Sequence, residues 1–180
     1  IKNNFVNSIS LSDRYTVFLN TYGSLYAIEN KSLNINWFIN LNQSLDINPS
    51  NLFKGSQILI DKNKIFISTN KFFYVLDIKT GSIIYRKNFS SDLKPIVINN
   101  HLFILTKNNF LISLDLTNGE YVYSYNLNQK IADFLNIKKR NAQYKNMMIL
   151  NNKIFIFLKN SYILKLKTNG EIENILKFPS

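Results

Sequence analysis

The chain has 180 residues, 46% of them hydrophobic, and its 22 lysine and arginine residues exceed its 11 acidic residues to give a net charge of +11. With no cysteine and one histidine it excludes disulfide bonds, and it leaves zinc, haem or iron–sulfur sites almost without ligands. No apolar run reaches the length of about 18 residues that a transmembrane helix needs.

The positive charge has two interpretations. It favours a partner of opposite charge, such as an acidic protein surface, nucleic acid or anionic lipid. The chain is also rich in lysine, asparagine, isoleucine, phenylalanine and tyrosine, all with AT-rich codons, and genome composition alone produces such a charge. Most aromatic residues fall at repeated strand positions, which favours core packing, so we expect no nucleic-acid binding.

One pattern occurs four times along the chain. Residues 63–89 align without a gap on residues 101–127, and the pattern occurs again at residues 15–41 and 152–178. Each copy contains three short apolar bursts, which lie at residues 65–67, 72–76 and 83–85 of the second copy. The bursts are too short for helices and rich in β-branched and aromatic residues, so they predict strands.

A fourth burst precedes each copy and completes a four-stranded antiparallel meander. These bursts lie at residues 6–11, 58–60, 96–98 and 147–150. The central strands are apolar at consecutive positions, which is typical of strands that are buried on both faces. The blades of a β-propeller meet that condition, and about 40 to 50 residues per repeat is the length of one blade. We therefore predict an all-β chain of about four propeller blades.

A turn before the last strand of each copy carries the most specific residues. Its aspartate can accept hydrogen bonds from the following backbone N–H groups, and its glycine can adopt a positive φ. An aromatic residue follows the glycine by four positions at Tyr85 and Tyr123, and Trp37 has the same place in the first copy. The predicted structural turn residues are Asp77, Thr80, Gly81, Asp115, Gly119 and Gly170.

These turns resemble the repeat of the PQQ-like (quinoprotein-type) β-propeller family, in which aspartate, Thr-Gly and a tryptophan follow one another. The outer copies depart from the pattern, with Glu29 and Leu33 in the first, and Leu166 and Asn174 in the fourth. Within the family, the resemblance is closest to the BamB-like lipoproteins of the outer-membrane β-barrel assembly machinery. It implies a ring of seven or eight blades, so we expect the remaining blades to precede Ile1, with a four-bladed ring or a dimer as alternatives.

Residues 1–180 are thus predicted to form one propeller portion. The expected blades are residues 5–41, 56–89, 94–127 and 146–178, and longer linkers at residues 42–55 and 128–145 separate them. Insertions in repeat proteins emerge as loops, often on the binding face. The candidate partner-binding residues are Leu52, Phe53, Lys138, Lys139 and Arg140. In the second linker we expect a short helix with Ile131, Phe134 and Leu135 on one side, the last two packed against a blade.

The sequence contains no catalytic, cofactor or metal motif that we can assign. His101 falls at a predicted turn, and no phosphate-binding or dinucleotide-binding glycine motif occurs. We therefore expect a non-enzymatic scaffold without a cofactor. The resemblance implies a location at the periplasmic face of the outer membrane, a lipid anchor preceding this sequence, and binding to the periplasmic domains of the barrel-assembly protein. The alternatives are a quinoprotein dehydrogenase with its cofactor site in other blades, and a WD-repeat-type scaffold.

Overall fold

The computed structural model describes residues 8–42, 53, 55–138 and 141–178, and these form four four-stranded antiparallel sheets and one helix. In each sheet, strands that follow one another in the chain are neighbours. The predicted all-β fold of four propeller-like blades is confirmed. No helix in these ranges is long and apolar enough to cross a membrane.

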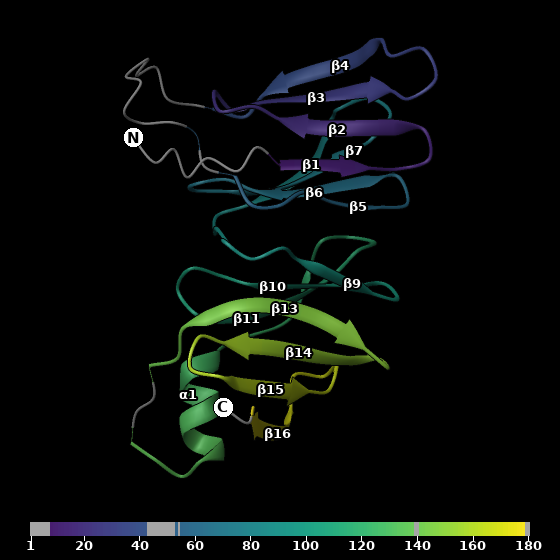
Figure 1. Ribbon diagram of the computed structural model, residues 1–180. Helices are drawn as coiled ribbons and strands as arrows, with labels where there is room; N and C mark the ends of the chain where they lie inside the picture. The colour runs from purple at the N-terminus through teal and green to yellow at the C-terminus, as the bar shows by residue number, and fades with distance from the viewer. Residues whose placement is uncertain (1–7, 43–52, 54, 139–140, 179–180) are drawn as a thin grey trace. The chain divides into compact units, whose positions relative to one another are not determined.

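Each blade is numbered in chain order and is a simple meander (Figure 1). The strands of blade 1 are β1 (Ser8–Leu11), β2 (Tyr15–Leu19), β3 (Ser24–Glu29) and β4 (Ile35–Asn40). Those of blade 2 are β5 (Leu59–Asp61), β6 (Lys64–Ser68), β7 (Phe73–Asp77) and β8 (Ile83–Lys87). Those of blade 3 are β9 (Ile96–Ile98), β10 (His101–Leu105), β11 (Phe110–Asp115) and β12 (Tyr121–Asn126). Those of blade 4, which follow the helix α1 (Leu127–Phe134), are β13 (Tyr144–Leu150), β14 (Lys153–Leu158), β15 (Tyr162–Leu166) and β16 (Ile172–Lys177).

The chain divides into two compact units, Ile1–Asp92 and Leu93–Ser180, each with two blades and its own core. In unit 1, side chains of blades 1 and 2 share a buried cluster that includes Val17, Leu25, Ile65, Tyr74 and Leu76. In unit 2, blades 3 and 4 and the helix share a cluster that includes Phe103, Leu111, Ile131, Ile156 and Leu164. Each unit therefore contains one complete contact between neighbouring blades.

Alternation along the strands gives each blade two faces. We call the face that carries Trp37 in blade 1, and the equivalent position of the other blades, the front face, and the opposite one the back face. The central front-face row of each blade runs over strands two, three and four. The four rows are Val17–Ala27–Trp37, Phe66–Val75–Tyr85, Phe103–Ser113–Tyr123 and Phe155–Lys165–Asn174.

These pairings correct the gap-free alignment of the repeats by one residue. The alignment places Ile65 on Phe103 and Val75 on Ser113. In the structure Phe103 pairs with Ser113, but the residue that pairs with Val75 is Phe66. Phe66, and not Ile65, is therefore the structural equivalent of Phe103. Ile65 instead pairs with Leu76, and both lie on the back face in the shared core of unit 1. Ile65 and Phe66 are both fully buried, as expected for a central strand that is covered on both faces.

Candidate protein-interaction surface

The glycines of the repeat turns have backbone conformations that side chains rarely adopt. Their φ angles are 72° at Gly81, 72° at Gly119 and 87° at Gly170. In the first of these turns, Asp77 Oδ1 accepts hydrogen bonds from the N–H groups of Lys79 (2.8 Å) and Thr80 (2.9 Å). The carboxylate thus holds the backbone that the glycine reverses, which is a structural role.

The equivalent aspartate of blade 3, Asp115, has the same structural role. Asp115 Oδ1 accepts a 2.6 Å hydrogen bond from Thr117 N–H, and this bond is the main reason that the pKa of Asp115 lies below its ordinary value. Asn100 also donates to this oxygen. A carboxylate whose pKa is lowered holds no proton to donate as an acid, and the local donors that lower its pKa also make it a weak base.

The turn of blade 4 is one residue shorter than the others. Gly170 N–H donates to the carbonyl of Lys167, three residues back, whereas Gly81 N–H donates to Asp77, four residues back. Lys167, and not Leu166 as the alignment suggested, therefore stands where blade 1 has Glu29 and blades 2 and 3 have aspartate. Its ammonium group pairs with Glu171 at 2.8 Å, and this pair raises the pKa of Lys167.

In unit 1, the aromatic residue of blade 1 sits on the glycine turn of blade 2. Trp37 Nε1 donates a 2.8 Å hydrogen bond to the carbonyl of Ile78. The indole ring lies directly over Gly81, where an added Cβ would be 2.6 Å from two ring carbons. The glycine is therefore needed both for its positive φ and for the room it leaves to the indole.

In unit 2, two tyrosines of blade 3 share this role at the turn of blade 4. The hydroxyl of Tyr123 donates to the carbonyl of Thr168 (3.2 Å), and that of Tyr125 to the carbonyl of Gly170 (2.6 Å). A Cβ at Gly170 would lie 2.9 Å from the Tyr125 ring. Burial raises the pKa of both phenols. Tyr125 was not singled out from the sequence, although its place two residues after Tyr123 puts it on the same strand face.

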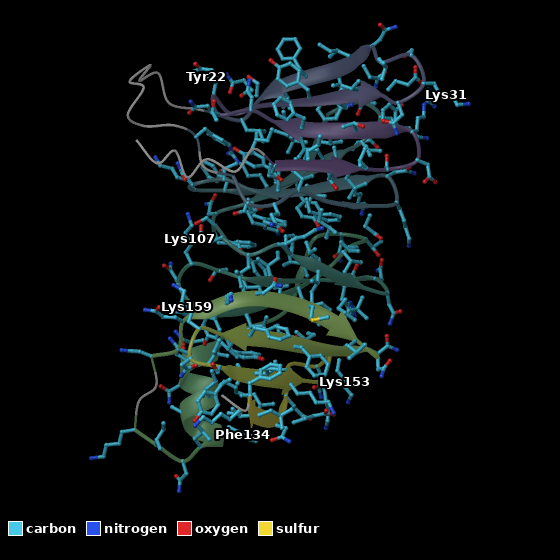
Figure 2. The ribbon with its side chains drawn as sticks, viewed as in Figure 1. Tyr22, Lys31, Lys107, Phe134, Lys153 and Lys159 are labelled. Atoms are coloured by element: carbon cyan, nitrogen blue, oxygen red, sulfur yellow. The ribbon has the colours of Figure 1, made fainter. Side chains whose placement is uncertain are left out.

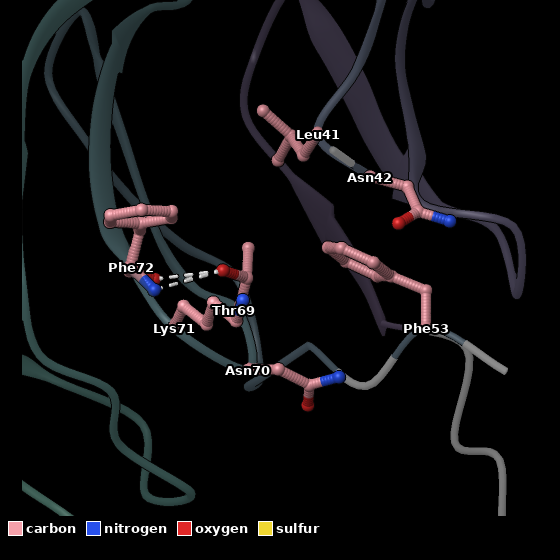
Figure 3. Close-up of a pocket in the computed structure, with 7 residues that line it drawn as sticks. All are labelled: Leu41, Asn42, Phe53, Thr69, Asn70, Lys71 and Phe72. Atoms are coloured by element: carbon pink, nitrogen blue, oxygen red, sulfur yellow. Dashed lines mark hydrogen bonds between the residues drawn. The ribbon is translucent and has the colours of Figure 1, made fainter. Parts of the chain in front are cut away.

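The first predicted partner-binding linker lies largely outside the described residues, including Leu52. Phe53 is described and is only 9% exposed, because it packs into the shared core of unit 1. Its backbone N–H donates to the carbonyl of Thr21 at 3.1 Å. Phe53 also lines a groove of about 340 Å³ (Figure 3). Its burial gives Phe53 an anchoring role and removes it as a residue offered to a partner.

The second linker contains α1, which begins at Leu127, earlier than the sequence suggested. The side chain of Asn126 caps the helix by accepting a hydrogen bond from Gln129 N–H at 3.1 Å. Leu127, Ile131 and Ala132 bury the inner side of the helix in the core of unit 2. The buried side of the helix therefore packs against the blades of unit 2, and this packing stabilises the helix.

The C-terminal end of α1 is equally well defined. Asn136 adopts a positive φ of 53°, and its N–H donates to the carbonyl of Asp133. The N–H of Ile137 donates to the carbonyl of Ala132 at 2.9 Å. Together these two bonds form a Schellman motif with asparagine in the left-handed position, which ends the helix and fixes the direction of the chain after it.

Three apolar side chains are exposed at this fixed helix end. The exposed fractions are 46% for Phe134, 41% for Leu135 and 42% for Ile137, and the next residue, Lys138, is also exposed (Figure 2 labels Phe134). The expectation that Phe134 and Leu135 pack against a blade is wrong, because Ile131 and Ala132 occupy the buried side instead. We call the four exposed residues Phe134, Leu135, Ile137 and Lys138 the α1 surface. Lys139 and Arg140 lie outside the described residues.

A groove of about 350 Å³ borders the α1 surface. It is lined by Lys130, Asp133, Phe134, Glu171 and Ile172. Phe134 thus forms one wall of the groove, and charges of both signs line the remainder. Such a mixture suits a polypeptide side chain better than a small apolar ligand.

Within the part of the chain that the structure describes, no three histidine or acidic side chains come close enough to hold a metal ion. His101 begins β10 and is half-buried, with its ring edge-on to Phe103 at a centroid distance of 6.4 Å. The described residues that the sequence analysis named thus fall into three groups. Some form turns, some pack one blade against the next, and some form the exposed apolar α1 surface.

No family model matches the chain, and neither does any curated protein. Solved structures do match. BamB from Moraxella catarrhalis is 16% identical, with a TM-score of 0.69 over 96% of this chain and 49% of that chain. A quinohemoprotein alcohol dehydrogenase from Comamonas testosteroni is 10% identical, with a TM-score of 0.69 over 94% of this chain and 34% of that one. The computationally designed Ika4 protein is 9% identical, with a TM-score of 0.62 over 99% of this chain and 94% of the designed one.

These likenesses define the class of fold. The chain consists of β-propeller blades, similar in structure to those of BamB and of a quinohemoprotein dehydrogenase, at low sequence identity. It spans about half the length of the BamB chain and about a third of the dehydrogenase chain.

Proposed function

We propose that the chain is part of a non-enzymatic propeller scaffold that binds other proteins, and that the α1 surface is one of its contact sites. The observation that carries this proposal is the exposure of Phe134, Leu135 and Ile137 together at a helix end whose direction is fixed by hydrogen bonds. Exposed apolar clusters with polar surroundings mark interaction sites more often than scattered single residues do.

The α1 surface has the composition of a protein-binding site. A large aromatic side chain beside a groove can serve as an anchor, and anchors of this kind carry most of the binding energy of an interface. Because the capped helix holds Phe134 in place before binding, little conformational entropy is lost on association. Lys138 adds a positive charge at the edge, where it favours an approaching acidic partner.

For the partner, the proposal names the periplasmic domains of the outer-membrane barrel-assembly protein. Two observations support it: the resemblance of the repeat turns to BamB-like lipoproteins, and the structural likeness of the blades to BamB. The scaffold would then act at the periplasmic face of the outer membrane, held by a lipid anchor on a segment outside this sequence. Lys139 and Arg140 remain candidate contacts on the same linker.

The test is a binding measurement on purified components. The unmodified chain, Phe134→Glu and Tyr22→Glu are titrated against the immobilised periplasmic domains of the barrel-assembly protein. Tyr22 is the matched control, since it is 71% exposed in a turn of unit 1 (Figure 2). We expect Phe134→Glu to weaken binding by about ten-fold or more, as for an interface anchor, and Tyr22→Glu to leave it unchanged.

Two results would contradict the proposal at different levels. If the unmodified chain does not bind, the proposed partner is wrong. If it binds and both variants bind equally well, the partner stands and the α1 surface is not the contact. Circular dichroism of each variant establishes that the exposed substitutions leave the fold intact.

A further inference from the structure

The back face of blade 1 carries an apolar surface that reaches across all four strands. One cross-strand row joins Ile9, Phe18, Tyr26 and Phe38. The rings of Phe18 and Tyr26 stack at 6.2 Å, and those of Tyr26 and Phe38 at 5.7 Å. Ile9 is 62% exposed and Phe38 is 68% exposed. Exposed apolar surface of this extent implies a partner.

The equivalent face of blade 2 reveals what kind of partner fits. There Ile65, Ile67, Tyr74 and Leu76 are each at most 1% exposed, and they lie in the cluster shared with blade 1. Tyr26 stands at the same place in blade 1 as Tyr74 in blade 2. A back face is thus a surface on which the front face of another blade packs.

Blade 4 has an unmatched front face that could supply this contact. In unit 2 the front face of blade 3, with Phe103, Leu105 and Leu111, is buried in the cluster shared with blade 4. The front face of blade 4 has half-buried Phe155 beside Met148, which is 41% exposed. Blade 4 therefore offers an open front face, and blade 1 offers an open back face.

Two departures from the repeat are compatible with a contact between these two open faces, although the front face of blade 4 also carries Lys165, which pairs with Glu173 at 3.2 Å. In blade 1 the turn glycine is replaced by Leu33, which keeps the positive φ (58°) and is 77% exposed. In blade 4 the aromatic residue is replaced by Asn174, which is exposed. Because a Cβ at Gly81 would already lie 2.6 Å from Trp37, an aromatic residue of that size cannot sit in the same way over Leu33. A blade with asparagine at this position leaves the room that Leu33 needs.

We propose that the back face of blade 1 binds the front face of blade 4 of a second copy of this chain, with Asn174 of one copy beside Leu33 of the other. A second copy is chosen as the occupant because it carries both faces, and because this chain covers only 49% of the BamB chain, so that two copies together match that chain in length. The contact joins two different surfaces, and such a contact must close into a ring or extend into a filament. The proposal is a ring of two copies, in which the two contacts would be identical.

The first experiment measures the mass of the 180-residue chain by light scattering during size-exclusion chromatography. We expect twice the chain mass of 21.0 kDa. Phe38→Glu on the back face and Met148→Glu on the front face should each yield the single-chain mass. Tyr22→Glu, an equally exposed aromatic position away from both faces, should keep the double mass. A single-chain mass for the unmodified protein, or a filament, would overturn the proposal.

The second experiment tests the contact itself, using the absence of natural cysteines. The variants Leu33→Cys and Asn174→Cys are mixed and treated with a short bis-maleimide. We expect a covalent two-chain product from the mixture and little from either variant alone, because the contact joins different positions of the two copies. The double variant should likewise give a two-chain product. Cross-linking of the double variant within single chains, or no cross-linking in the mixture, would contradict the proposed pairing.

Discussion

The two inter-blade contacts inside the units solve the same packing problem with different side chains. In unit 1 one indole covers the turn glycine and donates one hydrogen bond to the turn. In unit 2 the phenol rings of Tyr123 and Tyr125 together cover the turn, and their hydroxyls donate hydrogen bonds to the carbonyls of Thr168 and Gly170. What the contact requires is therefore aromatic area over a glycine together with a donor for a turn carbonyl, which several residue types can supply.

The strongest way to break the unit 1 contact is Gly81→Val. A β-branched residue at φ 72° is strained, and its Cβ would clash with Trp37. We expect a loss of about 3 kcal/mol or more in the free energy of unfolding, measured by urea denaturation. Leu33→Val is the control, since it places a β-branched residue at a similar φ of 58°, where the side chain is 77% exposed. Equal losses for the two substitutions would mean that the backbone strain alone accounts for the effect and that the clash with Trp37 contributes nothing.

Removing the indole should cost nearly as much from the other side of the contact. Trp37→Ala deletes the packing over Gly81, and we expect a loss of about 3 kcal/mol. Trp37→Phe keeps a ring but removes the hydrogen bond to Ile78, so a loss of about 1 kcal/mol is expected beyond the change in packing. If both variants unfold at the same urea concentration, the hydrogen bond, not the ring area, dominates.

High pH should weaken the unit 2 contact selectively. Burial raises the pKa of Tyr123 and Tyr125 in the folded state above the ordinary value of 10.0. Below pH 10 both states keep the proton, whereas above it the unfolded chain ionises first, so stability falls as pH rises. Because both rings are partly exposed, we expect about 1 kcal/mol or less per pH unit. The double variant Tyr123→Phe/Tyr125→Phe should have a shallower fall; an unchanged slope would contradict the assignment.

The smallest effect concerns one hydrogen bond of the unit 2 contact. Tyr125→Phe leaves the carbonyl of Gly170 without the phenol donor that now lies 2.6 Å away. We expect a loss of about 1 kcal/mol in thermal unfolding. Tyr22→Phe is the control, because the side chain of Tyr22 is 71% exposed in a turn of unit 1. A comparable loss in the control would show that the measurement does not report on this bond.

Repetition explains why so much of the fold could be predicted. Apolar bursts such as 65–67 mark strands because burial on both faces demands them, and Asp77 with Gly81 marks the turn because few residues satisfy its geometry. The strand register could not be predicted. The loop before the third strand differs by one residue between blades, and a strand that is apolar at consecutive positions can be shifted by one residue and still bury apolar side chains on both faces.

The candidate surface was harder to predict than the fold. The sequence identified the linker with Phe134 and Leu135, but not which side of the helix faces the core. That choice depends on the packing of Ile131 and Ala132 in the core of unit 2, which is a tertiary feature. The burial of Phe53 is likewise set by the core of unit 1, which its own linker sequence does not reveal.

The most direct test of the scaffold account is a pull-down with this protein from solubilised membranes of its own source, followed by mass spectrometry and an absorbance spectrum. The account predicts recovery of a barrel-assembly protein, reduced by Phe134→Glu and unaffected by Tyr22→Glu, and no absorbance from a bound quinone. A bound quinone without a protein partner would contradict it and assign the propeller to the quinoprotein enzymes.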